Sequence, residues 1–190
     1  MVRPEKPRAE IMKLLRTIQL DPSDTFVFDK AASPGEWAVP GAFYFWDGDP
    51  AFLEGKLRNA FRSGFLGVDS LGWSTLVQIV EANEEERAGV VDALARRLME
   101  NFGAPDIDAA KAAADDEVTF AQSLANQPAD TLIAIHRSYE DGEIREAFRT
   151  LRPRNGPKPL RAFSFLEVEG EDSAPADDVN LIGFAERDRR

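Results

Sequence analysis

The feature that most constrains this fold is an Asp141-Gly142 pair between two segments rich in strand-forming residues. The segment before the pair reads TLIAIHRSYE, and the segment after it reads EIREAFRTL. An Asp-Gly connection between two strands is typical of a type I′ turn, in which both central residues adopt a positive φ. The sequence therefore predicts an antiparallel hairpin over residues 132–151.

The register of this hairpin follows from pairing Glu140 with Glu143. One face then carries Tyr139 opposite Ile144, Arg137 opposite Glu146, and Ile135 opposite Phe148. The other face carries Ser138 opposite Arg145, His136 opposite Ala147, and Ala134 opposite Arg149. We expect the first face to pack against the core with a cross-strand ion pair, and the second face to be polar and basic.

Further strands are predicted where β-branched and aromatic residues lie between turn residues. They cover residues 13–20, 25–28 (after a turn at 21–24), 37–46, 73–82 and 161–169. The stretch WAVPGAFYFW at 37–46 has large rings on both faces, which is typical of a strand buried on both sides. Pro40-Gly41 indicates a bulge or a change of direction within it. Residues 64–72 are predicted to form a glycine-punctuated loop.

Three helices are predicted from caps and apolar periodicity. The first covers residues 50–63, with Asp49 as N-cap and Pro50 at the first helical position. The second covers 84–102 behind an Asn83/Glu86 capping box, and an alanine-rich third covers 106–126. The predicted fold class is α+β, with a largely antiparallel sheet of about six strands covered on one face by these three helices.

The length of 190 residues suits a single domain with tails. Residues 1–10 are expected to be a flexible leader, and residues 11–169 a single α+β domain. Residues 170–190 are expected to be an acidic linker and tail, because residues 167–178 contain six acidic residues and no basic one. The apolar run VNLIGF at 179–184 is either a docked strand or a disordered peptide.

Charge and composition exclude several classes of function. The net charge of −11 disfavours nucleic-acid and anionic-membrane binding. Zero cysteines and a single histidine exclude disulfides, thiolate nucleophiles, iron–sulfur clusters and histidine-rich metal sites. No apolar run is long enough for a membrane span, and no secretory signal is recognised, so we expect a cytoplasmic protein without a metal or cofactor.

The strongest candidate site is His136 with Arg145 and Arg149 on the basic face of the hairpin. Arg152, Arg154 and Lys158 follow in the adjoining link. Cationic groups around an imidazole favour an anionic ligand, such as a phosphate or carboxylate, and a neutral histidine able to act as a general base. The alternative is that the arginines pair with carboxylates of neighbouring helices and that the histidine is structural.

Three weaker candidates have structural explanations. Asp47-Gly48-Asp49 resembles a metal-binding DxD pattern, but Asp49 is already explained as a helix cap. Asp69 and Ser70 either line a pocket or make a tight turn, because their loop lacks the ending of a phosphate-binding loop. Residues 115–117, Asp-Asp-Glu, are interpreted as a solvated helix face. No Ser-His-Asp order is found.

Four stretches together resemble a family of uncharacterised bacterial, mostly proteobacterial, proteins. They are KLLRTIQLDPSDTFVF, GEWAVPGAFYFW, GFLGVDSLGWSTLVQIVEA and TLIAIHRSYEDGEIREAFRTLRPR. The resemblance runs from Met12 to about Glu169. It implies a stand-alone cytoplasmic domain and carries no established activity, cofactor or catalytic residue.

Two functions remain open. The first is a non-catalytic accessory or binding protein that recognises a protein partner or a small anionic ligand. The second is an enzyme acting on an anionic substrate with His136 as general base. The first is favoured because recognisable catalytic motifs are absent or weak.

Overall fold

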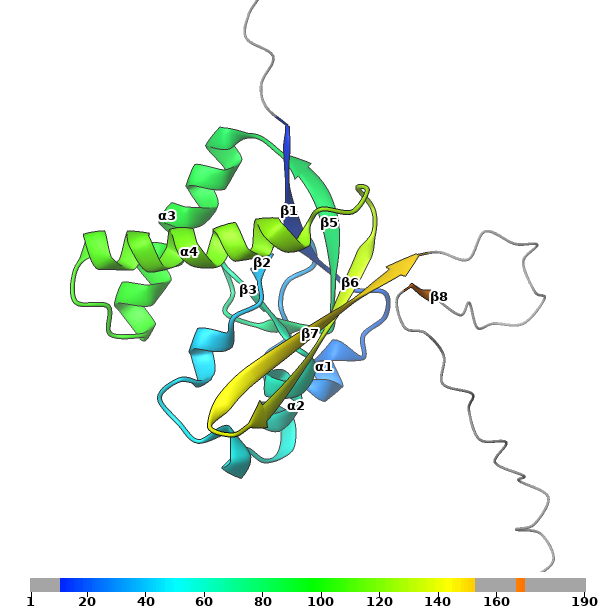
Figure 1. The fold of residues 1–190 in the computed structure, drawn as a ribbon, viewed down its shortest axis with the longest axis vertical. Helices are drawn as coiled ribbons and strands as arrows, with labels where there is room; N and C mark the ends of the chain where they lie inside the picture. The colour runs from blue at the N-terminus through cyan, green and yellow to red at the C-terminus, as the bar shows by residue number, and fades with distance from the viewer. Residues whose placement is uncertain (1–10, 153–166, 170–190) are drawn as a thin grey trace, which may run out of the picture.

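The named strands of the described residues pair antiparallel in a single sheet (Figure 1). A computed structural model describes residues 11–152 and 167–169. The strands are β1 (Met12–Ile18), β2 (Trp37–Val39), β3 (Phe65–Gly67), β4 (Trp73–Ser74), β5 (Leu76–Ala82), β6 (Leu132–Glu140), β7 (Glu143–Arg152) and β8 (Glu167–Glu169). Their order in the sheet is β4-β3-β2-β1-β5-β6-β7-β8.

The α+β class is confirmed, with more strands and helices than expected. Seven strands lie within residues 11–152, and β8 adds a short eighth strand beside β7, against about six in the prediction. The described α-helices are α1 (Asp24–Val27), α2 (Gly55–Ser63), α3 (Glu84–Asn101) and α4 (Ile107–Leu124). Two 3-10 turns, η1 (Ala42–Phe45) and η2 (Pro50–Phe52), precede α2.

The β6–β7 hairpin has the predicted register. Tyr139 pairs with Ile144, Arg137 with Glu146, and Ile135 with Phe148. Asp141 and Gly142 have φ values of 55° and 84°, as a type I′ turn requires. The turn residues and the register of this unit are therefore those that the local sequence predicts.

The core lies on one face of the central strands. Leu15 of β1 is opposite Ile79 of β5, and Val77 of β5 is opposite Ile133 of β6. All four side chains are almost fully buried. Side chains directly opposite each other in neighbouring strands lie on the same face of the sheet, so these residues form one continuous apolar layer.

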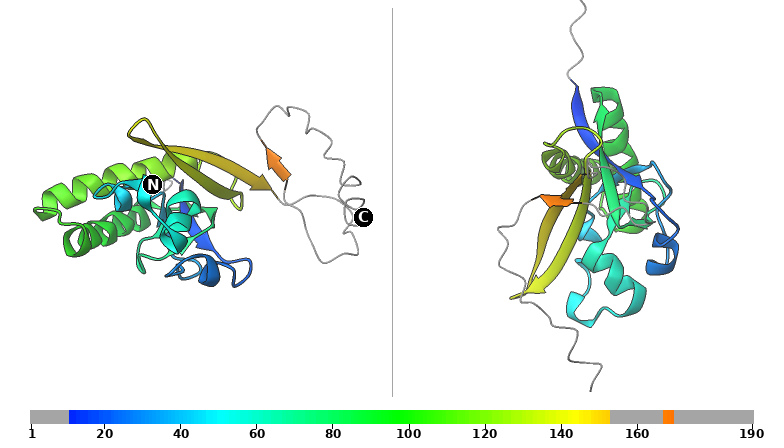
Figure 2. Two further views of the ribbon diagram at one scale, coloured as in Figure 1. Left: turned by 90° about the horizontal axis from the view of Figure 1, so that it is seen from below. Right: turned by 90° about the vertical axis from the view of Figure 1, so that its right-hand side faces the viewer.

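The two long helices, α3 and α4, are placed differently relative to this face. Phe120 of α4 contacts the ring of Phe148 on β7, at a centroid distance of 5.8 Å, so α4 crosses the face that carries Ile135 and Arg137. The buried stripe of α4 consists largely of alanines, which permits close approach to the sheet. Helix α3 packs mainly against α4, and Figure 2 (left) shows this pair at the opposite end of the molecule from β8.

The predicted capping box of α3 is observed, and α4 has an aspartate cap that was not predicted. Asn83 and Glu86 form the complete capping box of α3, with side-chain to backbone distances of 2.9 Å in both directions. Asp106 caps α4 through the backbone N–H of Ala109. Asp49 caps only the short η2 turn, because the predicted helix over 50–63 is interrupted before Gly55, where α2 begins.

Several predicted boundaries were wrong. Residues 24–27 form helix α1 and not a strand over 25–28, because Asp21-Pro22-Ser23 begins a helical turn that the backbone N–H groups of Thr25 to Phe28 continue. The strand predicted over 73–82 is divided between β4 and β5 at Thr75. The loop predicted over 64–72 contains β3, which is buried between β2 and β4.

The aromatic stretch 37–46 departs furthest from its prediction. Only Trp37–Val39 is a strand, and the chain then turns at Gly41 (φ 77°) into η1. A Cβ atom at Gly41 would meet the side chain of Leu66, so this turn requires glycine for both its φ and its close packing. The rings of residues 43–46 therefore do not alternate between the two faces of a sheet. Trp46 is 72% exposed.

Some predictions fall outside the described residues. These are the leader 1–10, the link 153–160, residues 161–166 of the last predicted strand, and the segment 170–190. Residues 167–169 of that last strand are observed as β8. None of the helices that the structure describes is long and apolar enough to cross a bilayer.

Candidate functional site

The hairpin brings a buried arginine to the centre of the molecule. Arg137 is 1% exposed, and its Nε atom donates to Oε1 of Glu146 at 2.6 Å. Its remaining guanidinium nitrogens donate to the carbonyl oxygens of Phe61 (3.1 Å), Gly64 (2.8 Å) and Pro40. Arg137 therefore joins the hairpin to the end of α2 and to the turn after β2, and its donors are used within the fold.

Glu117 of α4 lies half-buried near this pair of charges. Its Oε1 accepts the backbone N–H of Gly41 at 2.7 Å. Burial raises the pKa of Glu117, the hydrogen bond from Gly41 opposes this, and Glu146 and Arg137 have smaller effects in opposite directions. Burial likewise lowers the pKa of Arg137, with Glu146 opposing. Arginine nevertheless keeps its proton in proteins, so the cluster retains one fixed positive charge.

The interpretation of residues 115–117 as a solvated face was wrong for Glu117, which is half-buried against Gly41. Asp115 pairs with Arg87 of α3 at 2.8 Å and keeps half of its side chain exposed. Asp116 is exposed, as expected. Ala114 and Val118 belong to the buried stripe of α4, so the adjacent Glu117 points partly inward. The three consecutive acidic residues by themselves did not indicate this orientation.

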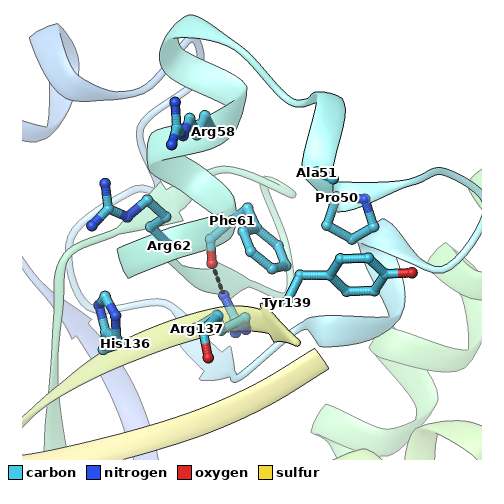
Figure 3. A pocket seen from close by; sticks show the side chains of 9 residues that line it. Pro50, Ala51, Arg58, Phe61, Arg62, His136, Arg137 and Tyr139 are labelled. Atoms are coloured by element: carbon cyan, nitrogen blue, oxygen red, sulfur yellow. Dashed lines mark hydrogen bonds between the residues drawn. The ribbon is translucent and has the colours of Figure 1, made fainter. Parts of the chain in front are cut away.

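His136 lines a pocket of about 240 Å³ between β6 and α2 (Figure 3). The walls also include Arg58 and Arg62 of α2 and Ser138 and Tyr139 of β6. In Figure 3, both arginines project from α2 on the side where His136 lies. We call the surface formed by Arg58, Arg62, His136 and Ser138 the cationic pocket.

The positive charge of the cationic pocket is uncompensated. Among the described residues, no acidic side chain lines it, and no hydrogen bond or ion pair is found for the side chains of Arg58, Arg62 or His136. Arg58 and Arg62 are one helical turn apart, so their guanidinium groups emerge from the same face of α2. The arrangement can hold an anion between two guanidinium groups, with the imidazole and the hydroxyl of Ser138 beside it.

The other predicted site residues that the structure describes do not line this pocket. Arg145 is at the hairpin tip, where it pairs with Glu140 (3.1 Å) and Asp141 (3.5 Å). Arg149 is exposed on β7, and Arg152 ends that strand. Arg154 and Lys158 lie outside the described residues. The structure thus brings His136 together with two arginines of α2 that the hairpin pattern did not identify.

A sequence feature for Arg58 and Arg62 was nevertheless present. They are spaced i, i+4 on a predicted helix, which puts them on one face. Arg58 and Arg62 lie beside His136 because α2 packs against β6. These two segments are more than 70 residues apart in the sequence, as are Arg137 and the Gly64 carbonyl that it contacts. Local patterns contain no information on that packing.

The other two candidates have structural roles. Asp49 accepts the backbone N–H of Ala51 at 2.9 Å, as the cap of η2. Asp69 and Ser70 form the tight turn that was one of the two interpretations, and their backbone N–H groups donate to Oε2 of the buried Glu36 at 2.9 and 2.8 Å. Among the described residues, no cluster of three or more histidine, cysteine, aspartate or glutamate side chains could hold a metal ion.

Residues 12–165 match one protein family, a range that includes β1 to β7 and every residue lining the cationic pocket. The chain belongs to DUF6505. This is a family of unknown function, which confirms the resemblance to uncharacterised proteins. Membership of this family therefore does not assign an activity to the chain. No curated protein and no solved structure matches the chain significantly.

Proposed function

We propose that this protein is a non-catalytic binding protein whose cationic pocket holds a small anion bearing a phosphate or carboxylate group. The observation that carries the proposal is the convergence of Arg58, Arg62 and His136 on one pocket without an acidic residue among its described lining residues. Guanidinium groups bind phosphate and carboxylate through paired, charge-assisted hydrogen bonds.

The overall charge makes this local arrangement informative. A protein with a net charge of −11 repels anions over most of its surface, so an anion site requires a local concentration of positive charge. Arg145 of the described hairpin does not provide one, because Glu140 and Asp141 neutralise it. Arg58 and Arg62 remain available to a ligand. The proposed ligand site thus shifts from the hairpin arginines to α2, while His136 stays part of it.

The second candidate is an enzyme that acts on the same anionic substrate with His136 as general base. Its support is that the only histidine of the chain lies in the pocket with the two arginines. A general base is normally oriented by a hydrogen bond to its second ring nitrogen. Within residues 11–152 no such partner is found for His136, so binding is the favoured function.

The proposal extends to the cellular setting expected from the sequence. We place this binding protein in the cytoplasm of a bacterium, where small phosphate- and carboxylate-bearing metabolites are its candidate ligands. A protein partner that presents a phosphorylated or acidic side chain would use the same two guanidinium groups. Titration with small anions separates these cases, because a small ligand binds without the rest of a partner surface.

The direct test is a titration of the ¹⁵N-labelled protein with inorganic phosphate, acetate and phenyl phosphate, followed by amide chemical shifts. We expect shifts at Arg58, Arg62, His136 and Ser138. Because each charge-assisted hydrogen bond contributes about 1.5–3 kcal/mol, the Arg58→Ala/Arg62→Ala variant should bind at least about tenfold more weakly. Arg145→Ala removes one arginine that is already paired with Glu140 and Asp141; it is the control and should bind nearly as the parent does. Equal losses in both variants, or no binding by the parent, would refute the proposal.

His136→Ala distinguishes the two functions. If the protein only binds, this change lowers anion affinity modestly, because both guanidinium groups remain. If His136 is a base, phenyl phosphate is hydrolysed by the parent, and His136→Ala abolishes hydrolysis with little change in affinity. The absence of any turnover by the parent across phosphate and carboxylate esters would favour the binding function.

A further inference from the structure

A second hollow adjoins the cationic pocket at the tip of the β6–β7 hairpin. It has a volume of about 420 Å³ and is lined by residues within 45–50 and within 139–144. We call it the tip hollow. Pro50 and Tyr139 line both the tip hollow and the cationic pocket, so the two hollows meet at these residues. A ligand held in the cationic pocket can therefore extend into the tip hollow.

The size of the two hollows indicates a ligand larger than a simple anion. Sites for small molecules typically have volumes of about 300–1,000 Å³. The cationic pocket, with about 240 Å³, lies below this range, whereas the tip hollow lies within it. A single phosphate or carboxylate group would leave most of this continuous surface unused.

Trp46 gives the tip hollow an aromatic face that is open to solvent and held in place. Its ring is 72% exposed, and it packs edge-to-face on Phe43 at a centroid distance of 6.5 Å. Phe43 in turn packs edge-to-face on Phe102, at the end of α3, at 5.2 Å. An accessible ring that is supported from behind can receive a planar ligand group at low entropic cost.

Tyr139 marks the passage between the two hollows. In Figure 3 its ring points away from Arg62 and His136, and its hydroxyl oxygen lies at the far end. Because the ring is partly exposed, a ligand can lie along it. An anion in the cationic pocket and a ring in the tip hollow would then be separated by about the length of one side chain. The ligand therefore needs a short spacer between the two groups.

The charges of the two hollows differ in sign. Arg58 and Arg62 carry two positive charges, which a phosphate monoester, with a charge of about −1.5 to −2 at pH 7, balances better than a single carboxylate. Among the described residues that line the tip hollow, Glu143 is the only charged one. A second anionic group would be repelled there, so the far end of the ligand is uncharged.

We propose that the ligand of the cationic pocket is a phosphate monoester joined through a short spacer to an uncharged planar aromatic ring, as in a nucleoside monophosphate. The inference rests on the proposed function and specifies its ligand. The phosphate lies between Arg58 and Arg62, and the ring packs on Trp46 and Tyr139 in the tip hollow.

The first experiment compares adenosine monophosphate, ribose 5-phosphate and inorganic phosphate as ligands of the full ¹⁵N-labelled chain. Adenosine monophosphate should bind about fivefold or more tightly than ribose 5-phosphate, because only the former has a ring that can stack. Its binding should also shift the indole N–H signal of Trp46, whereas ribose 5-phosphate should not. Trp46→Leu identifies this signal among those of the three tryptophans.

Variants then separate the ring contact from the phosphate contact. Trp46→Leu should weaken adenosine monophosphate by about fivefold or more and leave ribose 5-phosphate unchanged. Phe52→Leu is the matched control, because it removes an equally exposed ring from the same segment that lines neither hollow. Arg58→Ala/Arg62→Ala should weaken both phosphate esters by the same factor.

A charged ring tests the role of Glu143. Orotidine monophosphate differs from uridine monophosphate by a carboxylate on the ring, so it should bind more weakly to the parent. Glu143→Gln should reduce the difference between these two ligands. An unchanged difference would show that Glu143 does not face the ring.

The outcomes distinguish this inference from the proposed function. Equal binding of adenosine monophosphate and ribose 5-phosphate, or equal effects of Trp46→Leu and Phe52→Leu, would overturn the inference and leave the anion site intact. The absence of binding by all three phosphate probes would refute the proposed function, and the inference with it. The comparison of ligands on the parent chain does not depend on the folding of any variant.

Discussion

At the scale of single residues, Arg137 shows how a charged side chain can become part of a core. The guanidinium group is desolvated, and it is compensated by one carboxylate and three backbone carbonyl oxygens. Two of those carbonyls close the end of α2, and one belongs to the turn before η1. The ion pair was predicted from the hairpin register, but its role in joining three segments was not.

Replacing this residue tests that role. Arg137→Met leaves Glu146 buried without its partner, and it should lower the free energy of unfolding by about 3–5 kcal/mol. Urea unfolding followed by circular dichroism measures the change. Arg145→Ala removes an exposed pair and should cost less than about 1 kcal/mol. The double variant Arg137→Met/Glu146→Leu should recover part of the loss, and a double variant as unstable as the single one would show that the carbonyl contacts dominate.

Gly67 is a second residue whose identity is dictated by a neighbour. A Cβ atom there would overlap the carboxylate of Glu36, which accepts hydrogen bonds from Ser33, Asp69 and Ser70. We expect Gly67→Ala to lower the free energy of unfolding by about 1–3 kcal/mol through this overlap. Gly48→Ala is the matched control, because nothing lies within 4 Å of its added Cβ. Thermal unfolding of both variants decides whether Glu36 is as rigidly held as its contacts indicate.

At the scale of elements, Glu117 couples α4 to the turn after β2. Its pKa is raised by burial, so the folded protein holds this proton more tightly than the unfolded chain. Below the ordinary value of 4.5 both states are protonated, and above it the unfolded chain ionises first. As pH rises from 4.5 through the raised pKa of Glu117, ionisation of this group therefore lowers the free energy of unfolding by a growing amount.

Glu117→Gln removes this dependence while retaining an oxygen that can accept the Gly41 N–H. The difference in unfolding free energy, variant minus parent, should become more positive as pH rises from 4.5 towards 7. Urea titrations at a series of pH values measure it, with exposed Glu54→Gln as control. A difference that is constant with pH would mean that Glu117 ionises equally easily in both states.

At the scale of the whole molecule, the sheet order places β1 and β5 in the middle and β4 and β8 at the edges. Strand β1 is paired on both sides and carries fully buried Leu15, whereas the hairpin tip at Glu140–Glu143 is exposed and forms an end of the β6–β7 pair. We therefore expect local stability to decrease from the centre of the sheet towards the hairpin tip.

Native-state hydrogen exchange measures this gradient. We expect the paired amides of β1 and β5 to exchange only through global unfolding, and those at residues 139–144 to exchange through local opening. Addition of denaturant should accelerate the first group and leave the second nearly unchanged. Equal denaturant dependence of both groups would show that the hairpin tip opens only with the entire domain.

Local sequence chemistry determined the hairpin and the caps. Asp141-Gly142 sets the turn, Asn83 with Glu86 sets the start of α3, and Asp106 sets the start of α4. In each case the deciding interactions lie within a few residues. The aromatic stretch 37–46 could not be predicted in this way, because its turn at Gly41 is set by contacts with Leu66 and Glu117.

The tertiary structure alone decided which charged residues share a site. Arg137 of β6 meets the Gly64 carbonyl at the end of α2 across 73 residues, and the same packing of α2 against β6 sets Arg58 and Arg62 beside His136. Sequence patterns report which face of an element a side chain occupies. They do not report which element that face will meet, because this depends on the fit of many buried side chains over long separations in the chain.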